Sequence, residues 1–455
     1  MPTTTPRRVR FAAIPLLRQL VLSLAARVLT SDVEPSMPEA PRRRMQPSER
    51  RVRVNDVHSQ LNETEVAEIV AVDSLDAIRA AISRAAERDL PVSVSGGRHA
   101  MGGQQFCADG VQLDTRPLAR VLDLDREGGT VEVEAGLQWP ELLAYLRREQ
   151  EGARFAWTFR QKQSGADRLS IGGAVSANAH GRGLAFKPFV DDVESLTLVD
   201  AKGDVVTCSR TQNRDLFRLV VGGYGLFGVV YSVRLRLVPR LTLERLVEVR
   251  SLDGVVDAFE QRIEDRFLYG DFQFATDPGD PGFLRRGIFS CYRPVAVDAP
   301  IPAGQRALSR EDWKQLLLLA HVDKAKAWER YSTHYLSTSG QLYDSDAHQL
   351  TEYVDDYHAW LDAVTDAPER ATEMITELYL PRDRLADFMR EAARDFRTHG
   401  VDLVYGTVRL IERDDESFLA WAREPWACVI FNLHVVHTPT GLASAADAFR
   451  RLIDL

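Results

Sequence analysis

Three segments rich in glycine and other small residues constrain this sequence more than any other feature. They are SGGRHAMGGQ (95–104), SIGGAVSANAHGRG (170–183) and GGYGLFGVV (222–230), and they lie about 70 and 50 residues apart. Glycine tolerates positive φ and lets other atoms approach the backbone closely, so each segment can bend sharply around a ligand. Alternating helix and strand patterns join the segments. We therefore expect one extended ligand that is held by discontinuous pieces of backbone.

The first glycine segment follows a helix and a strand in the predicted order. SLDAIRAAISRAAERDL (74–90) has apolar residues at helical spacing behind Ser74, a favourable N-cap, and PVSVSGG (91–97) reads as a short strand. Backbone N–H groups of such a loop can converge on an anion, and a pyrophosphate is the natural guest, although glycines also make ordinary turns. The Rossmann fingerprint differs, since its glycines open a helix directly. Here strands follow the loop, which disfavours an ordinary NAD fold.

In this order, SGGRHAMGGQ, SIGGAVSANAHGRG, DDVESLTLVDAKGDVV (191–206) and GGYGLFGVV resemble the FAD domain of the vanillyl-alcohol-oxidase / p-cresol-methylhydroxylase (PCMH) superfamily. That group includes cytokinin dehydrogenases and alditol and aldonolactone oxidases. The resemblance implies a PCMH-type two-subdomain FAD-binding domain over residues 55–240. It assigns the FAD pyrophosphate to Gly96, Gly97, Arg98, His99, Ala100, Met101, Gly102, Gly103 and Gln104. It assigns the flavin body to Asp167, Ser170, Gly172, Gly173, Asn178 and His180, and the adenine or ribityl side to Gly223, Gly225, Gly228 and Val229.

His99 is the most informative single residue. In the family, this position often carries a histidine that is bonded through a ring nitrogen to the 8α-methyl carbon of the flavin, which requires a neutral imidazole as nucleophile. The resemblance thus implies covalent FAD through His99, although Arg98 stands between the glycines and the histidine. The alternative is a histidine that hydrogen-bonds the phosphate loop. Arg168 and Leu169 occupy the place where some relatives carry a second, cysteine attachment, so we expect no double link.

Residues 241–455 read as an α+β substrate domain with an antiparallel sheet covered by helices on one face. The aromatic residues of a largely helical stretch, 311–362, are typical of a core. ELYLPRDRL (377–385) and TVRLIERDD (407–415) resemble segments of the substrate domain of aldonolactone and alditol oxidases. This resemblance implies that Arg409 faces the flavin, where it polarises a substrate oxygen or stabilises negative charge on the reduced flavin. A salt-bridged strand residue is the alternative.

The relatives' catalytic acid lies two residues before this arginine, where the sequence has Thr407. Either another group takes the proton, or the substrate is not a sugar alcohol or lactone. Glu377 and His434 are the candidates for the base, and packing is the alternative role of His434. On a strand His434 and His437 would point to opposite faces, so they cannot share a metal. The four cysteines are widely spaced, and we predict packing thiols and no metal site.

Residues 1–54 read as a basic N-terminal extension and linker. Up to residue 53 it holds eleven arginines and four acids, whereas the whole chain carries a net charge of −9. An amphipathic interfacial helix, an odd twin-arginine export signal at Arg7 and Arg8, and a poorly ordered extension all stay open. Two arginines interrupt the apolar stretch, which disfavours a membrane span. At the other end the chain stops in an apparent helix, so the substrate domain is either C-terminally incomplete or without the family's tail.

These patterns together predict an FAD-dependent oxidoreductase. It would transfer a hydride from a small polar substrate (an alcohol, a sugar or lactone-like molecule, or an amine) to flavin N5 while a base takes a proton. Oxygen or another acceptor would then receive the electrons. A membrane-surface flavoenzyme acting on a prenyl-linked sugar or sterol-like lipid, and a flavin-binding protein without turnover, remain alternatives. The acidic balance argues against a nucleic-acid partner. We expect a cytoplasmic protein, with membrane association or export through the basic extension as alternatives.

Overall fold

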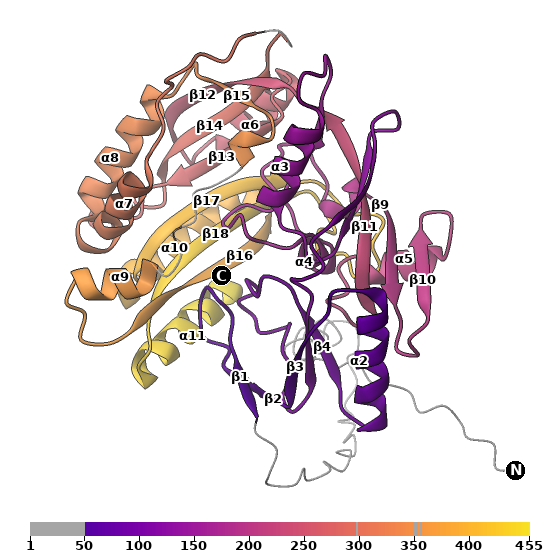
Figure 1. Cartoon of the computed structure of the whole chain (residues 1–455). Coiled ribbons are helices and arrows are strands. Elements are labelled where there is room, and N and C mark those ends of the chain that lie inside the picture. The colour runs from indigo at the N-terminus through magenta and orange to yellow at the C-terminus, as the bar shows by residue number, and fades with distance from the viewer. Residues whose placement is uncertain (1–50, 297–298, 350–353, 355–356) are drawn as a thin grey trace, which may run out of the picture.

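The computed structural model describes residues 51–296, 299–349, 354 and 357–455. The interpretations of the basic extension therefore lie outside the described residues. Figure 1 shows two regions side by side, an N-terminal region (51–240, indigo to magenta) and a C-terminal region (241–455, ending in yellow). Within the described residues, the sheets of each region use that region's own strands, apart from one isolated bridge between Gly183 and Tyr269.

The N-terminal region begins with a small parallel sheet of order β3-β5-β4 beside a two-stranded antiparallel pair, β1 with β2. Helix α2 begins after Ser74, whose hydroxyl accepts from the Ala77 N–H, so the predicted N-cap is confirmed. Its apolar stripe is buried against this sheet. The bounds are β1 (Val52–Val54), β2 (Thr64–Val66), β3 (Glu68–Ala71), α2 (Leu75–Glu87), β4 (Val92–Ser95) and β5 (Val111–Asp114).

A six-stranded antiparallel sheet forms the rest of this region, in the order β10-β9-β11-β7-β6 with β8 paired to β11. The strands predicted directly after the first glycine segment are present, which confirms that this loop leads into sheet. Trp139 at the start of α3 is fully buried in the core of this sheet. The bounds are β6 (Val121–Asp125), β7 (Thr130–Glu134), α3 (Trp139–Glu149), β8 (Trp157–Phe159), α4 (Ile171–Ala177), β9 (Val193–Val199), β10 (Val205–Ser209), α5 (Arg214–Val220) and β11 (Val229–Pro239).

The C-terminal region is built on a seven-stranded antiparallel sheet of order β15-β12-β14-β13-β17-β18-β16. None of the helices within the described ranges has the length and apolar character needed to cross a membrane. The bounds are β12 (Thr242–Ser251), α6 (Val255–Glu264), β13 (Tyr269–Phe274), β14 (Arg286–Pro294), α7 (Arg310–Val322), α8 (Lys324–Ser337), β15 (Leu342–Asp344), α9 (Tyr357–Val364), β16 (Ala371–Pro381), α10 (Leu385–His399), β17 (Leu403–Ile411), β18 (Trp426–Val436) and α11 (Pro439–Asp454).

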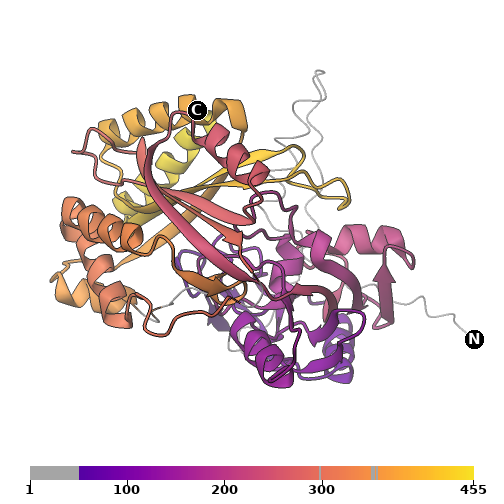
Figure 2. The ribbon, with the colours of Figure 1, turned by 90° about the horizontal axis from the view of Figure 1, so that it is seen from above.

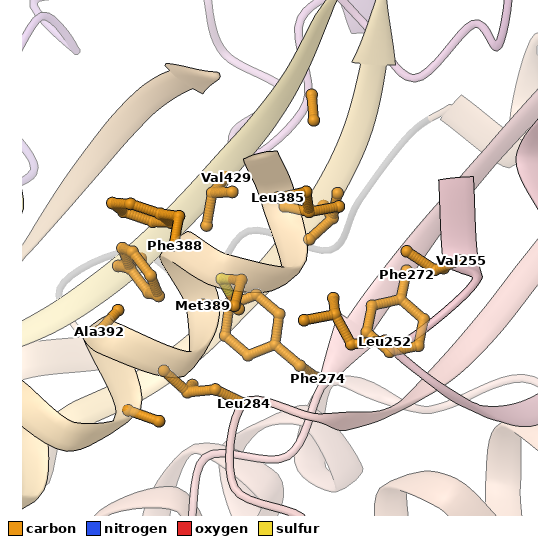
Figure 3. Close-up of a cluster of buried hydrophobic side chains, with 14 of the residues drawn as sticks. Leu252, Val255, Phe272, Phe274, Leu284, Leu385, Phe388, Met389, Ala392 and Val429 are labelled. Atoms are coloured by element: carbon orange, nitrogen blue, oxygen red, sulfur yellow. The ribbon is translucent and has the colours of Figure 1, made fainter. Parts of the chain in front are cut away.

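Helices α6, α10 and α11 cover one face of this sheet, as predicted. Figure 3 shows Phe388 and Met389 of α10 against Phe274 and Val429 of the strands, and all four side chains are buried. Alternate strand residues supply this core, so the residues between them face the other way. In Figure 2 the N-terminal region and α10 lie on opposite sides of the sheet. The face that is free of α10 is therefore turned toward the N-terminal region.

Helices α7 and α8 depart from the prediction, because they lie against that second face. The Tyr331 hydroxyl of α8 donates to Gln273, which alternates with the core residues Phe272 and Phe274 on β13. Helix periodicity shows which stripe of a helix is buried but not which face of a sheet it covers. Helices thus cover part of both faces.

Candidate active site

A cavity of about 590 Å³ lies between the N-terminal region and the second face of the seven-stranded sheet. The N-terminal region contributes His58, Ser164, Gly165 and Arg182 to its lining, and the C-terminal region contributes the rest, from α7, α8, α9, the strands and the segments between them. Ligand pockets occur preferentially where two regions of a protein meet. This cavity is the candidate active site.

Strand β17 brings the predicted Arg409 to this cavity. Val408 and Leu410 lie in the core, whereas Tyr405 and Arg409 line the cavity, as alternation requires. The Arg409 side chain is 6% exposed, and its Nε has no hydrogen-bond partner among the described residues. A buried guanidinium with an unused donor is suited to hold a substrate or cofactor oxygen.

The pairing of neighbouring strands places Glu377 of β16 near Arg409. Glu377 pairs with Ile430 of β18, and Ile430 pairs with Thr407 of β17, two residues before Arg409. Burial raises the pKa of the Glu377 carboxyl, but the charge and hydrogen bond of His180, the hydrogen bond from Tyr379 and the Arg409 guanidinium outweigh it and lower this pKa to about 2. Glu377 is therefore an ionised carboxylate at the cavity wall at neutral pH.

His180 joins the second glycine segment to this carboxylate. Its Nδ1 donates to the Gly181 carbonyl, 2.9 Å away, which leaves Nε2 facing Glu377 Oε2 at 3.3 Å. Nε2 is also 3.9 Å from Cys428 Sγ. The three side chains could hold a metal ion by spacing, since their ligand atoms lie within 4.8 Å of one another. Burial raises the pKa of the Cys428 thiol well above its usual value, which disfavours the thiolate that a metal requires.

The first glycine segment folds into a cradle that fits a phosphate group. A Cβ on Gly96 would overlap the Ser170 hydroxyl, so the first and second segments touch. Arg98 and Gly103 adopt positive φ, of 57° and 70°. Ser95 Oγ and Arg98 Nε are buried without a hydrogen-bond partner in the part of the chain that the structure describes. Buried donors of this kind suit an anionic guest.

The second segment forms α4, which has close backbone contacts. Ser170 caps this helix by accepting from the Gly173 N–H at 3.4 Å, and a Cβ on Gly172 would lie 2.7 Å from that of Ala135. Asn178 ends the helix at φ 45°, donates to Asp414 and accepts from the Val190 N–H. The Asn178 side chain is thus engaged with protein partners rather than facing a ligand.

Protein partners also hold other residues for which the resemblance implied flavin contact. Asp167 forms an ion pair of 2.9 Å with Lys162, whose side chain is fully buried. The Met101 sulfur accepts from the Ile375 N–H at 3.4 Å and so ties the first segment to β16. These contacts anchor the glycine segments to their surroundings.

The third segment packs on the second. The Gly222 N–H donates to Val175, and the Tyr224 N–H donates to Ser176, both in α4. Gly225 has φ 78° and open space around it, whereas a Cβ on Gly228 would overlap Leu198, and Val229 is buried in the core. Gly228 and Val229 therefore serve packing. The three glycine segments form one contiguous backbone surface.

His434 is the predicted site residue that the structure separates from the others. It pairs with Glu373, four residues before Glu377 on β16, which is about 13 Å along a strand. Its ring is 5.0 Å from that of His321, and it is not among the residues that line the cavity. The structure thus brings Arg409, Glu377 and His180 together and leaves His434 outside this group.

Sequence reasoning missed several polar residues of the cavity wall, among them Arg182, Arg245 and Asp271. The prediction of a core for the aromatic residues of 311–362 was wrong for those that line this cavity: Trp313, Trp328, Tyr331, Tyr335 and Tyr357. Tyr379, which donates to Glu377, has a sequence signal, since it follows Glu377 by two residues and shares its face of the strand. Arg182 lies in the HGRG segment, where the glycines are the more evident signal. Nothing in the local sequence distinguishes Arg245 or Asp271.

Comparison with known proteins gives one matching family and several relatives. Residues 66–209 match the FAD binding domain family. An L-gulono-1,4-lactone dehydrogenase of Mycobacterium tuberculosis is 27% identical over 370 residues, which cover 79% of this chain and 77% of the relative. An L-gulonolactone oxidase of Mus musculus is 27% identical over 43% of this chain and 44% of its own length. Cytokinin dehydrogenase 3 of Oryza sativa subsp. japonica is 34% identical over 32% of this chain and 28% of its own length.

Proposed function

Because this chain is an FAD-dependent oxidoreductase of the vanillyl-alcohol-oxidase / p-cresol-methylhydroxylase superfamily, we propose that it dehydrogenates a polyhydroxylated, lactone-like substrate in the cavity beside Arg409. When bound, FAD accepts the hydride that leaves the substrate carbon. The chain itself positions the substrate, takes the proton and balances the charge. The observation that supports this proposal best is the convergence of Arg409, Glu377 and His180 beside the glycine segments.

Glu377 is the proton acceptor in this proposal. It lines the cavity, it is ionised at neutral pH, and its Oε2 accepts from the Tyr379 hydroxyl at 2.7 Å. His180, 3.3 Å away, fixes the orientation of the carboxylate. A base in fixed orientation contributes roughly 100- to 10,000-fold to a rate. His180 then acts as a positioning residue, which differs from the flavin contact that the resemblance implied.

Arg409 balances negative charge as the proton leaves. Its guanidinium is buried and its Nε has no partner within the described ranges, so it is available to a substrate oxygen or to the reduced cofactor. A fixed cation in a buried position stabilises developing charge more strongly than it would in solution. The charge of Arg409 also helps to keep Glu377 ionised.

This arrangement offers an explanation for Thr407, which stands where relatives carry an acid. Thr407 is fully buried. It lies opposite Ile430 of β18 in the sheet, and Ile430 in turn lies opposite Glu377 of β16. A carboxylate can therefore reach the same part of the cavity from β16 instead of β17. The acid is relocated across the sheet in this proposal rather than lost.

The class of substrate follows from the relatives and is a proposal for this chain. A relative that aligns over 79% of the chain is named for L-gulono-1,4-lactone, and cytokinin dehydrogenase 3 aligns over 32%. Anaerobic mixing of the yellow protein with L-gulono-1,4-lactone or with a cytokinin tests the choice. Bleaching of the flavin absorbance by the lactone is expected. Bleaching by the cytokinin instead would contradict the lactone class.

We further propose covalent attachment of FAD through His99. The His99 ring packs against Gly97, with an edge carbon 2.9 Å from the position of a Cβ there, so the histidine belongs to the cradle. Absorbance after acid precipitation provides the test, because a linked flavin stays with the protein. We expect yellow colour in the pellet of the wild type and in the supernatant of His99→Ala. Yellow colour confined to the wild-type supernatant would contradict attachment.

A further inference from the structure

The end of the cavity beside β12 is strongly cationic. We call Arg182 and Arg245, together with Tyr292 between them, the cationic end. Arg245 lies on β12 and is 7% exposed, and its Nε donates to the Ser290 hydroxyl at 3.0 Å. Among the described residues, no carboxylate oxygen lies within 4.0 Å of its guanidinium. Its charge is therefore buried without a direct counter-ion.

Arg182 reaches the same place from the second glycine segment. Its guanidinium donates to the His348 carbonyl and lies 3.8 Å from Asp271 Oδ2, while its Nε has no partner in the described part of the chain. Arg182 and Arg245 both lie over the Tyr292 ring, at 5.4 and 5.5 Å from its centroid. Arg245 also lies over the Tyr335 ring, at 4.3 Å from its centroid. The Tyr292 ring is thus shared by two guanidinium groups that come from different regions of the molecule.

The charges at this end do not balance. The two arginines face one carboxylate, Asp271, which is 2% exposed and whose Oδ1 has no partner among the described residues. His348 adds no charge, since burial and then the nearby Arg182 lower its pKa well below the usual value. A buried cation without a counter-ion is costly, and an anion that binds beside it lowers this cost. The geometry calls for one more negative group.

We propose that the cationic end is a subsite for an oxyanion, a carboxylate or a phosphate, carried by the substrate away from its reacting carbon. This inference rests on the proposed function, because it treats the cavity as the substrate site. Arginine presents a planar fork of donors that matches both oxyanions. The Tyr292 ring beside the arginines would shield the bound oxyanion from water, so the attraction between the oxyanion and the arginines would be screened less.

The position of this subsite indicates the shape of the substrate. Strand β12 is three strands from β17 in the order β12-β14-β13-β17. Neighbouring strands are about 4.8 Å apart, so Arg245 and Arg409 stand on backbones that are roughly 14 Å apart. Both side chains extend into the cavity. A molecule that reaches both is elongated, with its anionic group at one end and its reacting carbon near the other.

The test is anion binding to the FAD-loaded protein, in which the pyrophosphate cradle is already filled. Thermal stability is measured against inorganic phosphate and against acetate, with sodium chloride holding the ionic strength constant. We expect at least one of the two to raise the Tm of the wild type in a saturable way, and the better one identifies phosphate or carboxylate as the group. A wild type that responds to neither anion would overturn the subsite.

Variants locate the binding. Arg245→Gln removes the charge and the fork, and we expect its apparent affinity for the anion to fall about tenfold or more, as for loss of a charged hydrogen bond. Arg250→Gln is the matched control, since Arg250 lies on the same strand but faces Phe289 of the core and pairs with Glu248. Equal anion affinity in Arg245→Gln and wild type would refute the proposal. If Arg245→Gln fails to fold, Arg245→Lys keeps the charge without the fork, and an unchanged affinity there refutes the bidentate site.

The test of the anion subsite can fail independently of the test of the proposed function. Anion binding needs no turnover, so a protein that binds phosphate through Arg245 but is not bleached by any lactone keeps the subsite and loses the lactone proposal. A protein that is bleached by L-gulono-1,4-lactone but shows no Arg245-dependent anion binding keeps the activity and loses the subsite.

Discussion

The two regions of this molecule contribute to the site in different ways, one mainly through its backbone and the other through its side chains. The N-terminal region uses mainly backbone: glycines, positive φ angles and helix ends form the contiguous surface of its three segments, to which His180 and Arg182 add side chains. The C-terminal region uses side chains, since alternate residues of an antiparallel sheet project Arg409, Glu377 and Arg245 into the cavity. In the N-terminal region, a side chain added at several of these glycines would collide with neighbouring atoms. In the C-terminal region, a side chain can change its chemistry while the strand beneath it stays the same.

The largest expected effect tests the side-chain half of this contrast. Glu377→Gln keeps the shape but cannot accept a proton, and we expect kcat to fall about 100- to 10,000-fold with an unchanged flavin content. Arg409→Met should lower kcat by a similar factor through loss of charge stabilisation. Steady-state kinetics and the flavin-to-protein absorbance ratio check both. Glu391→Gln, at an exposed ion pair on α10, is the control. A Glu377→Gln enzyme with kcat near that of the wild type would remove Glu377 from the mechanism.

A neighbouring pair of glycines tests the backbone half. A Cβ on Gly172 would lie 2.7 Å from the Ala135 Cβ and 2.9 Å from its carbonyl oxygen, whereas a Cβ on Gly173 meets only the Ser170 hydroxyl, at 3.0 Å. Gly172→Ala should lower the free energy of unfolding by about 1–3 kcal/mol, as overpacking does. Gly173→Ala should cost clearly less. Urea unfolding of the two variants measures the difference, and equal losses would show that close packing does not explain Gly172.

A smaller effect is expected in the pH dependence of stability, and it depends on Glu373 of β16. Glu373 is fully buried, and hydrogen bonding and the charge of His321 outweigh its burial and lower its pKa to about 2. Because this pKa is below its unfolded value of 4.5, the stabilisation is present above pH 4.5 and is lost as pH falls toward 2. One such group changes stability by at most about 1.4 kcal/mol per pH unit.

Glu373→Gln should therefore flatten the acid side of the stability profile. The partner His321 titrates in the opposite sense: interaction with Glu373 outweighs burial and raises its pKa, so its contribution is complete below pH 6.5 and declines as pH rises. The variant should flatten that decline too. Thermal melts from pH 3 to pH 9 check both limbs, and an acid limb identical to that of the wild type would show that Glu373 does not determine it.

The smallest effect is expected at His434. It does not line the cavity, and it pairs with Glu373 rather than with Glu377. His434→Gln should leave kcat within about threefold of the wild type, since a residue away from the reacting atoms contributes no general-base term. Steady-state kinetics decide this as well. A drop comparable to that of Glu377→Gln would instead make His434 the base.

Local signals made much of the fold predictable. Ser74 predicts the start of α2, and the alternation of TVEVE predicts β7, because capping and strand periodicity depend on neighbours in sequence. The relations across long distances were not predictable in this way. Arg182 and Arg245 are far apart in sequence and meet over one tyrosine through the packing of two regions. The placement of α7 and α8 on the second face likewise depends on tertiary packing, which no local pattern records.

The contact between His180 and Glu377 has a consequence for engineering. The His180 imidazole belongs to the loop after α4, while the carboxylate that it contacts at 3.3 Å belongs to β16. A chimera that receives residues 51–240 from a relative without a histidine at position 180 would lose this partner of Glu377. On the proposed mechanism, such a hybrid should bind flavin and yet turn over slowly until His180 is restored.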